Sequence, residues 1–175
     1  MTPYRLTVCG IDELPEHASA GVTHVISLLD PEAPVPHTLQ HFPELRRRWV
    51  LRFHDVGRGL PGTRAPEAGD VTELLAVGEQ LRFESDGHVL VHCHAGVSRS
   101  TAAAAILMAR EAPGEERAAL DTVARLRPIA SPNARMLRLA DETLARAGAL
   151  TRAYEAWLQD RLDTRHPLLG KLFGR

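Results

Sequence analysis

The sequence predicts an α/β fold in which a mostly parallel sheet of about four or five strands is flanked by helices. Short apolar runs alternate with helical patterns through the first half of the chain. The run Val89 to Val91 is continuous, as expected for a strand that is buried on both faces. The second half shows helical patterns alone. Because strands that alternate with helices pack in layers, these observations together favour a sheet covered by helices.

Four strands are expected, each a short apolar run bounded by polar or turn-forming residues: 4–9, 22–29, 49–54 and 88–93. The segment 31–48 contains four prolines and is predicted to be a surface loop. Proline fixes its own backbone and lacks the N–H group that a helix interior needs. A second loop, rich in glycine and proline, is expected over 57–66.

Six helices are expected: a short one over 12–20, then helices that begin near 67, 100, 115 and 131, and a last one that carries Tyr154, Trp157, Leu158 and Leu162. The helix over 100–110 is rich in alanine, the best helix former, and Pro113-Gly114 ends it. Ser131 followed by Pro132 is typical of an N-cap and first turn, and Gly148 can close the helix that they open.

Length and composition favour one domain without a nucleic-acid partner or a membrane span. The chain has 175 residues, 44% of them hydrophobic, so we expect a single domain over 1–175 with a core over about 4–148 and a C-terminal helix and tail over 149–175. The 21 basic and 22 acidic residues nearly balance, so nucleic acid is not an expected partner. No apolar run approaches the roughly 20 residues of a membrane span. With no signal-peptide core and two cysteines, a cytoplasmic location is expected.

The most informative stretch lies between the last predicted strand and the alanine-rich helix: His92-Cys93-His94-Ala95-Gly96-Val97-Ser98-Arg99-Ser100. Five residues, His94 to Ser98, separate Cys93 from Arg99 at a helix N-terminus. There the amide N–H groups and the helix dipole can cradle an anion. Gly96 permits close backbone approach, and the planar fork of Arg99 matches two phosphate oxygens. A phosphate-binding loop is therefore predicted.

Cys93 lies at the start of this loop and is the predicted nucleophile. The field that binds a dianion also favours a thiolate, which could attack phosphorus in line and form a phosphocysteine. The Ser100 hydroxyl can donate to the sulfur and ease its departure when water cleaves that intermediate. His92 can support Cys93 by hydrogen bonding from beneath.

The pattern His92-Cys93-x-Ala95-Gly96-x-Ser98-Arg99-Ser100 resembles the signature of the cysteine-based protein tyrosine phosphatases, specifically the dual-specificity branch. The order of elements over about 4–144 is also similar to the compact catalytic domain of that family. The resemblance implies hydrolysis of phosphomonoesters without a metal or another cofactor. Pro132-Asn133 resembles a family element in which the asparagine supports the phosphate loop.

The family uses an aspartate on a mobile loop to protonate the leaving group. An alkoxide or phenolate leaves slowly unless it is protonated, so this proton transfer speeds the reaction. Asp55 is the first candidate, because it follows the third predicted strand and precedes the glycine-rich segment 57–59. Asp30 also ends a strand and is the second candidate. Asp70 falls inside a predicted helix and is the third.

Several functions remain open at this stage. The loop lacks the lysines of phosphoinositide phosphatases in the superfamily, which favours a phosphorylated protein, on tyrosine or on serine and threonine, as the substrate. A phosphoinositide or another non-protein phosphomonoester is the alternative substrate. A catalytically idle phosphate-binding module and a rhodanese-like sulfur transferase are the alternative classes. The presence of Cys93, Arg99 and Ser100 together, with Asp55, favours the hydrolase.

Other features are more simply explained by structure. Cys9 is expected to be a small core residue, with a resolving partner for oxidised Cys93 as the alternative. His92, Cys93 and His94 lack an obvious fourth ligand, and neighbouring strand residues face opposite ways, so no metal site is expected. The run Arg46 to Arg48 is expected to be solvated, with phosphosubstrate docking as the alternative. The apolar tail 168–173 is expected to dock on the body or fray, with a membrane or partner contact as the alternative.

Overall fold

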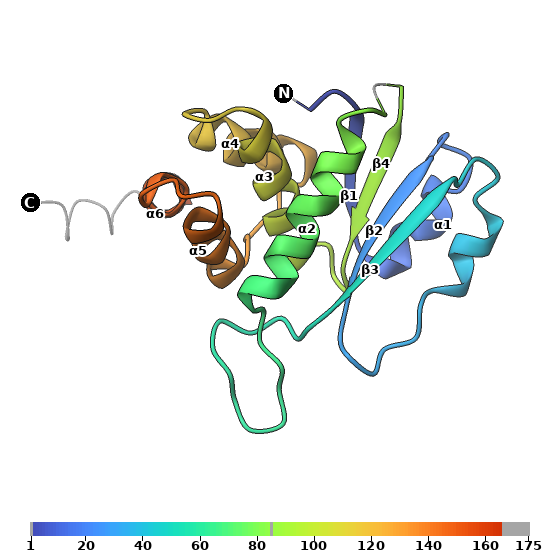
Figure 1. Cartoon of the computed structure of the whole chain (residues 1–175), viewed down its shortest axis with the longest axis horizontal. Helices are drawn as coiled ribbons and strands as arrows, with labels where there is room; N and C mark the ends of the chain where they lie inside the picture. The colour runs from blue at the N-terminus through green and yellow to red at the C-terminus, as the bar shows by residue number, and fades with distance from the viewer. Residues whose placement is uncertain (1, 85, 166–175) are drawn as a thin grey trace, which may run out of the picture.

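A computed structural model describes residues 2–84 and 86–165, and in it four strands form one sheet: β1 (Arg5–Cys9), β2 (His24–Leu29), β3 (Arg47–Arg52) and β4 (His88–His92). Their order is β1-β4-β2-β3, and every neighbouring pair is parallel (Figure 1). The predicted α/β class with a mostly parallel sheet is confirmed. Each of the four predicted strands is present, with β3 beginning two residues earlier than expected.

The helices pack in two unequal layers. They are α1 (Leu14–His17), α2 (Ala68–Leu81), α3 (Arg99–Glu111), α4 (Glu116–Leu126), α5 (Ala134–Thr143) and α6 (Ala149–Arg165), with 3₁₀ turns at Ile11–Glu13 and His37–His41. In Figure 1, α2 to α6 lie on one side of the sheet, while α1 and the turn at 37–41 lie on the other. The predicted helix over 12–20 is divided between a 3₁₀ turn and the single turn of α1, and the predicted loop over 31–48 includes the second 3₁₀ turn.

Strand β4 is covered on both faces of the sheet, which explains the apolar run Val89 to Val91. Val89 and Val91 belong to the large core beneath α2 to α6, whereas Leu90 belongs to the smaller core beneath α1 and the 37–41 turn. Successive strand residues face opposite sides of a sheet, so the centre of a strand covered on both faces is apolar without alternation. The histidines at the two ends of β4 are buried with hydrogen-bond partners, His88 with Thr7 and His92 with Ser27. All five residues of β4 are buried.

The structure corrects the predicted boundaries of the fifth helix. Ser131 is not its N-cap: Asn133 caps it, with its Oδ1 accepting from the Met136 N–H at 3.1 Å. The backbone N–H of Ser131 instead donates to the Val97 carbonyl. Asparagine caps a helix as well as serine does, so with Ser131 and Asn133 only two positions apart a tertiary contact decided which residue caps the helix. The helix also ends at Thr143, and Gly148 precedes α6 rather than closing α5.

Helix α6 extends the main core. Leu150 and Trp157 are both buried in it, and the Arg161 guanidinium lies 4.6 Å from the centre of the Trp157 ring. The apolar tail over 168–173, for which docking was predicted, lies outside the described residues. Within 2–84 and 86–165, none of the helices has the length and apolar character to cross a membrane.

Candidate active site

The predicted phosphate loop lies at the carboxyl end of the sheet. Strand β4 ends at His92 and α3 begins at Arg99, so residues 93–98 turn between a buried strand and a helix N-terminus. Cys93 is only 2% exposed, and its Sγ lies 3.2 Å from Ser100 Oγ in the first turn of α3. The loop has therefore the strand, turn and helix arrangement that the motif predicted.

Gly96 allows the loop to pack against the turn that follows β1. Its φ of 69° is in the left-handed region, which residues other than glycine rarely adopt. A Cβ atom at this position would lie 2.5 Å from the backbone carbon of Cys9 and 2.5 Å from the Gly10 nitrogen. The Ile11 N–H also donates to the His94 carbonyl at 2.9 Å. The loop is thus fixed from below by the chain around Gly10.

Arg127, at the end of α4, holds the loop from outside, and the sequence analysis did not identify it. Its Nε donates to the Gly96 carbonyl at 3.0 Å and its Nη2 to the Ala95 carbonyl at 3.1 Å. Its Nη1 donates to Glu13 Oε1 at 2.7 Å, and Glu13 Oε2 accepts from the Gly10 N–H. This contact with Arg127 holds the pKa of Glu13 below its usual value. One ion pair therefore connects the loop carbonyls to the turn beneath them.

Arg99 is buried but keeps part of its guanidinium without a protein partner. Its side chain is 4% exposed, and Nη1 donates to Asp30 Oδ1 at 2.6 Å and to the Phe53 carbonyl at 2.7 Å. Its Nε has no hydrogen-bond partner among the described residues. A buried donor without a partner is costly, so this edge of the guanidinium is well suited to an anionic ligand.

Asp55 lies over the loop and joins two predicted site residues. Its Oδ1 accepts from Ser98 Oγ at 2.7 Å and from Asn133 Nδ2 at 2.8 Å. No donor from the described residues reaches its Oδ2. Asn133 uses its other side-chain atom to cap α5, and its backbone N–H donates to the Ser98 carbonyl at 3.3 Å. Asn133 therefore contacts both the loop and the aspartate.

A cavity of about 340 Å³ opens over Cys93. Its walls come from the phosphate loop, from the end of β2 and from the segment after β3: Asp30, His54, Asp55, Val56, Thr63, Cys93, His94, Ala95, Val97, Ser98 and Arg99. The structure thus brings together the predicted nucleophile, the arginine and the first two candidate acids. Gly96 and Ser100 lie below the cavity surface. Asp70 is not in the cavity: it accepts from Arg64 at 2.7 Å and from the Glu67 N–H at the start of α2.

His92 is buried, and among the described contacts its side chain makes no hydrogen bond to the Cys93 sulfur, which it was expected to support. Its Nε2 lies 2.7 Å from Ser27 Oγ on the neighbouring strand, and its Nδ1 has no partner among the described residues. Burial lowers the pKa of His92 to about 4, an effect that the Cys93 backbone only partly opposes. The side chain of His92 is therefore a neutral imidazole packed beneath the loop.

A second arginine missed by the sequence analysis organises the Asp30 segment. Arg52 Nη1 donates to the carbonyls of Asp30, Pro31 and Ala33 at 3.2, 2.9 and 2.8 Å. With 20 arginines among the 21 basic residues, no sequence signal separates Arg52 or Arg127 from those at the surface. Only the folded structure shows which of them contact loop carbonyls.

The remaining cysteine fits a core position. Cys9 is 1% exposed within the smaller core, and burial raises its pKa to about 12. Both Cys9 and Cys93 are free thiols. Among the described residues, no group of three or more histidine, cysteine, aspartate or glutamate side chains is arranged to hold a metal ion.

Comparison with known proteins gives relatives by structure and not by sequence: no protein-family model and no curated protein matches the chain. Human DUSP28 superposes with a TM-score of 0.62 at 20% identity, covering 82% of this chain and 94% of that chain. DUSP15 gives 0.60 at 23% identity, covering 86% and 90%. The human tyrosine phosphatase-like serine/threonine/tyrosine-interacting protein gives 0.56 at 24% identity, covering 78% and 85%.

The chain therefore has the fold of the cysteine-based protein tyrosine phosphatases, in the compact form seen in dual-specificity phosphatases. The expected fold is confirmed on this ground, and the chain covers most of each compared structure.

Proposed function

We propose that this protein hydrolyses phosphomonoesters through a phosphocysteine formed on Cys93. The observation that carries the proposal is the cavity itself, whose surface includes Cys93, Arg99 and Asp55 together. A site for binding alone would need the arginine and the loop amides. It would not need a thiol at the centre with a hydroxyl 3.2 Å behind it.

In the first step, the Cys93 sulfur attacks the phosphorus atom while the bond to the ester oxygen breaks. Arg99 and the loop at the N-terminus of α3 stabilise the negative charge on the phosphoryl oxygens. Asp55 gives its proton to the departing oxygen. Two donors already occupy Asp55 Oδ1, so its free Oδ2 is the atom that would carry this proton.

In the second step, water attacks the phosphocysteine and Asp55 takes back a proton from that water. The sulfur leaves as a thiolate, which the Ser100 hydroxyl stabilises by donating a hydrogen bond across the 3.2 Å contact. Inorganic phosphate is then released, and the cysteine and the aspartate are returned to their starting states.

Asp30 is better suited to orienting Arg99 than to donating a proton. Its carboxylate accepts from Arg99 Nη1 at 2.6 Å, so the guanidinium occupies the oxygen that would have to meet a leaving group. Fixing one Nη atom in this way directs the remaining donors of Arg99 toward a bound phosphate. Asp55 has no such cation among the described residues.

A phosphorylated protein is the substrate class that we favour, with tyrosine or serine and threonine as the phosphorylated residue. The fold shared with DUSP28 and DUSP15 supports it, and so does the loop composition, because no lysine lies between Cys93 and Arg99. We also propose a cytoplasmic location, because the two free cysteines suit a reducing compartment.

The test is turnover of p-nitrophenyl phosphate by the wild type and by Cys93→Ser, with and without a chelator. We expect turnover that is insensitive to chelator in the wild type and is lost in the variant, because a hydroxyl at this position is a far weaker nucleophile. The variant should still bind phosphate, since Arg99 and the loop remain. If Cys93→Ser retained a tenth of the wild-type activity, the assignment of Cys93 as the nucleophile would be refuted.

The same experiment examines the second candidate, a phosphate-binding module without activity. The structural likeness to a protein described as phosphatase-like and interacting favours this candidate. A wild-type protein that binds phosphate and phosphopeptides but releases no phosphate would support it over the hydrolase.

A further inference from the structure

Strand β1 is an edge of the sheet whose outer backbone groups have no partner among the described residues. It pairs with β4 on one side only. The Arg5 N–H donates to the Gly87 carbonyl, and strand residues alternate in the direction of their backbone groups. The N–H and C=O groups of Leu6 and Val8 must therefore point away from the sheet. An exposed row of this kind is a template for another extended chain.

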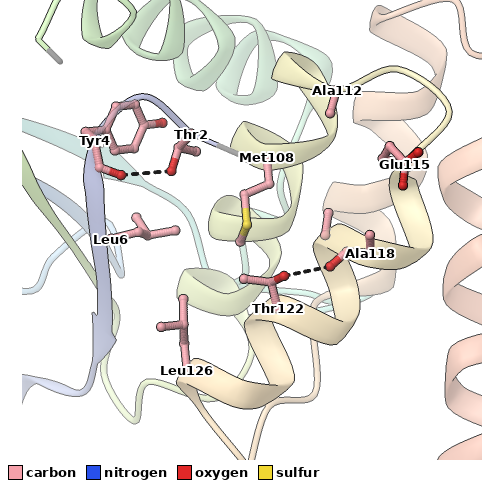
Figure 2. Close-up of a pocket in the computed structure, with 10 residues that line it drawn as sticks. Thr2, Tyr4, Leu6, Met108, Ala112, Glu115, Ala118, Thr122 and Leu126 are labelled. Carbon is pink, nitrogen blue, oxygen red and sulfur yellow. Dashed lines mark hydrogen bonds between the residues drawn. The ribbon is translucent and has the colours of Figure 1, made fainter.

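An apolar groove runs along this edge. Figure 2 shows its three sides: Leu6 on β1 with Tyr4 just before it, Met108 on α3, and Thr122 and Leu126 on α4. Its volume is about 230 Å³. Leu126 is 42% exposed at one end. A strand added to β1 would thus place alternate side chains in an apolar space between the sheet and α4.

The edge is recessed between two walls. A second cavity, of about 280 Å³, continues past Leu6 to Val8, with Glu16 and His17 from α1 on one side and Leu126 from α4 on the other. A single extended chain fits between such walls. A second copy of this protein does not bring its own β1 into contact easily, because the same walls flank that strand.

Acidic side chains lie at both ends of the groove. Glu115 lies at the start of α4 and Glu16 on α1, both are exposed, and neither forms an ion pair with another described residue. Arg127 also lines the second cavity, but its charge is paired with that of Glu13. These charges favour lysine or arginine at the ends of a bound segment. The opposite edge, β3, carries two adjacent exposed arginines, Arg47 and Arg48, whereas β1 has an exposed arginine only at its first residue, Arg5.

We propose that the groove along β1 binds an extended segment of a partner protein, which pairs with Leu6 and Val8 as a fifth strand. Alternate apolar side chains of the segment contact α4, and basic residues near its ends meet Glu16 and Glu115. This is recognition by strand addition, in which main-chain hydrogen bonds give affinity and the groove gives specificity. The site is separate from the cavity over Cys93, and it does not depend on catalysis.

The probe is a synthetic library of fluorescent octapeptides that carry apolar residues at alternate positions and lysine at both ends. We expect members that bind, and we expect Ala118→Arg to weaken their binding by about tenfold or more, because the new side chain fills the groove. Ala118 is exposed on α4, so arginine fits there without disturbing the core. Ala156→Arg, on the exposed side of α6, is the matched control and should leave binding unchanged.

A second measurement depends on no protein variant. N-methylation of the peptide amides that face β1 removes main-chain donors while keeping the side chains, and should also weaken binding by about tenfold. Amide hydrogen exchange should slow at Leu6 and Val8 in the complex. A library with no binding member, binding that Ala118→Arg leaves intact, or a dimer of the free protein that Ala118→Arg dissociates would each overturn the proposal.

Discussion

Two aspartates face the same cavity, and their hydrogen bonds separate their roles. Asp30 is held by the Arg99 guanidinium at 2.6 Å, whereas Asp55 accepts from two neutral donors, Ser98 and Asn133. The free Oδ2 of Asp55 can meet the oxygen of a leaving group, whereas the carboxylate of Asp30 is engaged by the Arg99 guanidinium. Asp55 is therefore suited to carry a proton and Asp30 to direct the arginine.

Leaving-group dependence tests this division. Asp55→Asn should lower kcat on phenyl phosphate by about 10²-fold or more, because an unprotonated phenolate leaves slowly. The loss should shrink on p-nitrophenyl phosphate, whose phenolate needs little protonation. The basic limb of the pH–rate profile should flatten once the acid is gone.

Asp30→Asn is the matched comparison. It should raise KM and lower kcat by similar factors on both esters, because it disturbs phosphate binding and not proton transfer. Strong leaving-group dependence in Asp30→Asn, together with a uniform loss in Asp55→Asn, would reverse the two assignments.

Arg127 provides a residue-scale prediction away from the reacting atoms. Arg127→Ala removes both hydrogen bonds to the loop carbonyls and leaves Glu13 without its cation. We expect phosphate affinity and kcat/KM to fall by about 10- to 100-fold, since small displacements of a catalytic loop are expensive. Arg125→Ala, which loses only an exposed contact to Thr122, should stay close to the wild type.

Inhibition by inorganic phosphate distinguishes this positioning role from a loss of stability. Arg127→Ala should bind phosphate more weakly at temperatures where circular dichroism shows an intact fold. Normal phosphate affinity in a folded Arg127→Ala protein would show that Arg127 does not position the loop.

At the scale of elements, burial on both faces made the sheet predictable. β2 and β4 are buried at every position, so most of their residues are apolar and sequence patterns reveal them. The Cys93 to Ser100 segment was equally predictable, because its chemistry is local. The start of α5 was not, since Ser131 and Asn133 are both good caps and a backbone contact to Val97 decides between them.

Long-range contacts of the site escaped prediction for a related reason. Asp55 and Asn133 lie far apart in the chain but share a hydrogen bond of 2.8 Å, and Arg127 meets Glu13 across the sheet edge. Each residue type is common and polar, and nothing local marks the pairing. Sequence reasoning could name Asp55 and Asn133 as candidates, but only the fold shows that one contacts the other.

The strands also carry buried histidines that predict loss of stability in acid. Burial lowers the pKa values of His24, His88 and His92, the last to about 4. Because the unfolded chain binds these protons near pH 6.5, stability is complete above that pH and falls as the pH drops toward 4. His92 alone should cost about 2 kcal/mol at pH 5.

Urea unfolding at pH 7.5 and pH 5 measures this effect. His92→Gln should reduce the pH dependence of the unfolding free energy, whereas His37→Gln, at an exposed position, should leave it unchanged. Equal pH dependence in the wild type and in His92→Gln would contradict the claim that burial of His92 lowers stability in acid.

For the whole molecule, the fold places each part of the site on a different segment. The proposed nucleophile follows β4, the candidate acid follows β3, Asp30 follows β2, and Asn133 precedes α5 (Figure 1). Parallel strands present their carboxyl ends at one edge of the sheet, so these segments meet there without long connections. Helix α6 packs on α4 and α5 and adds Trp157 to the core behind them.

The central claim is that a phosphoryl group passes through Cys93, and trapping that intermediate tests it most directly. Ser100→Ala should slow the second step, because the departing thiolate loses its hydrogen-bond donor, so acid quenching during turnover should preserve the phosphocysteine. Peptide mass spectrometry should then locate one phosphoryl group on Cys93 in Ser100→Ala and none in Cys93→Ser. A phosphoryl group on another side chain, or steady turnover by Cys93→Ser, would contradict the account.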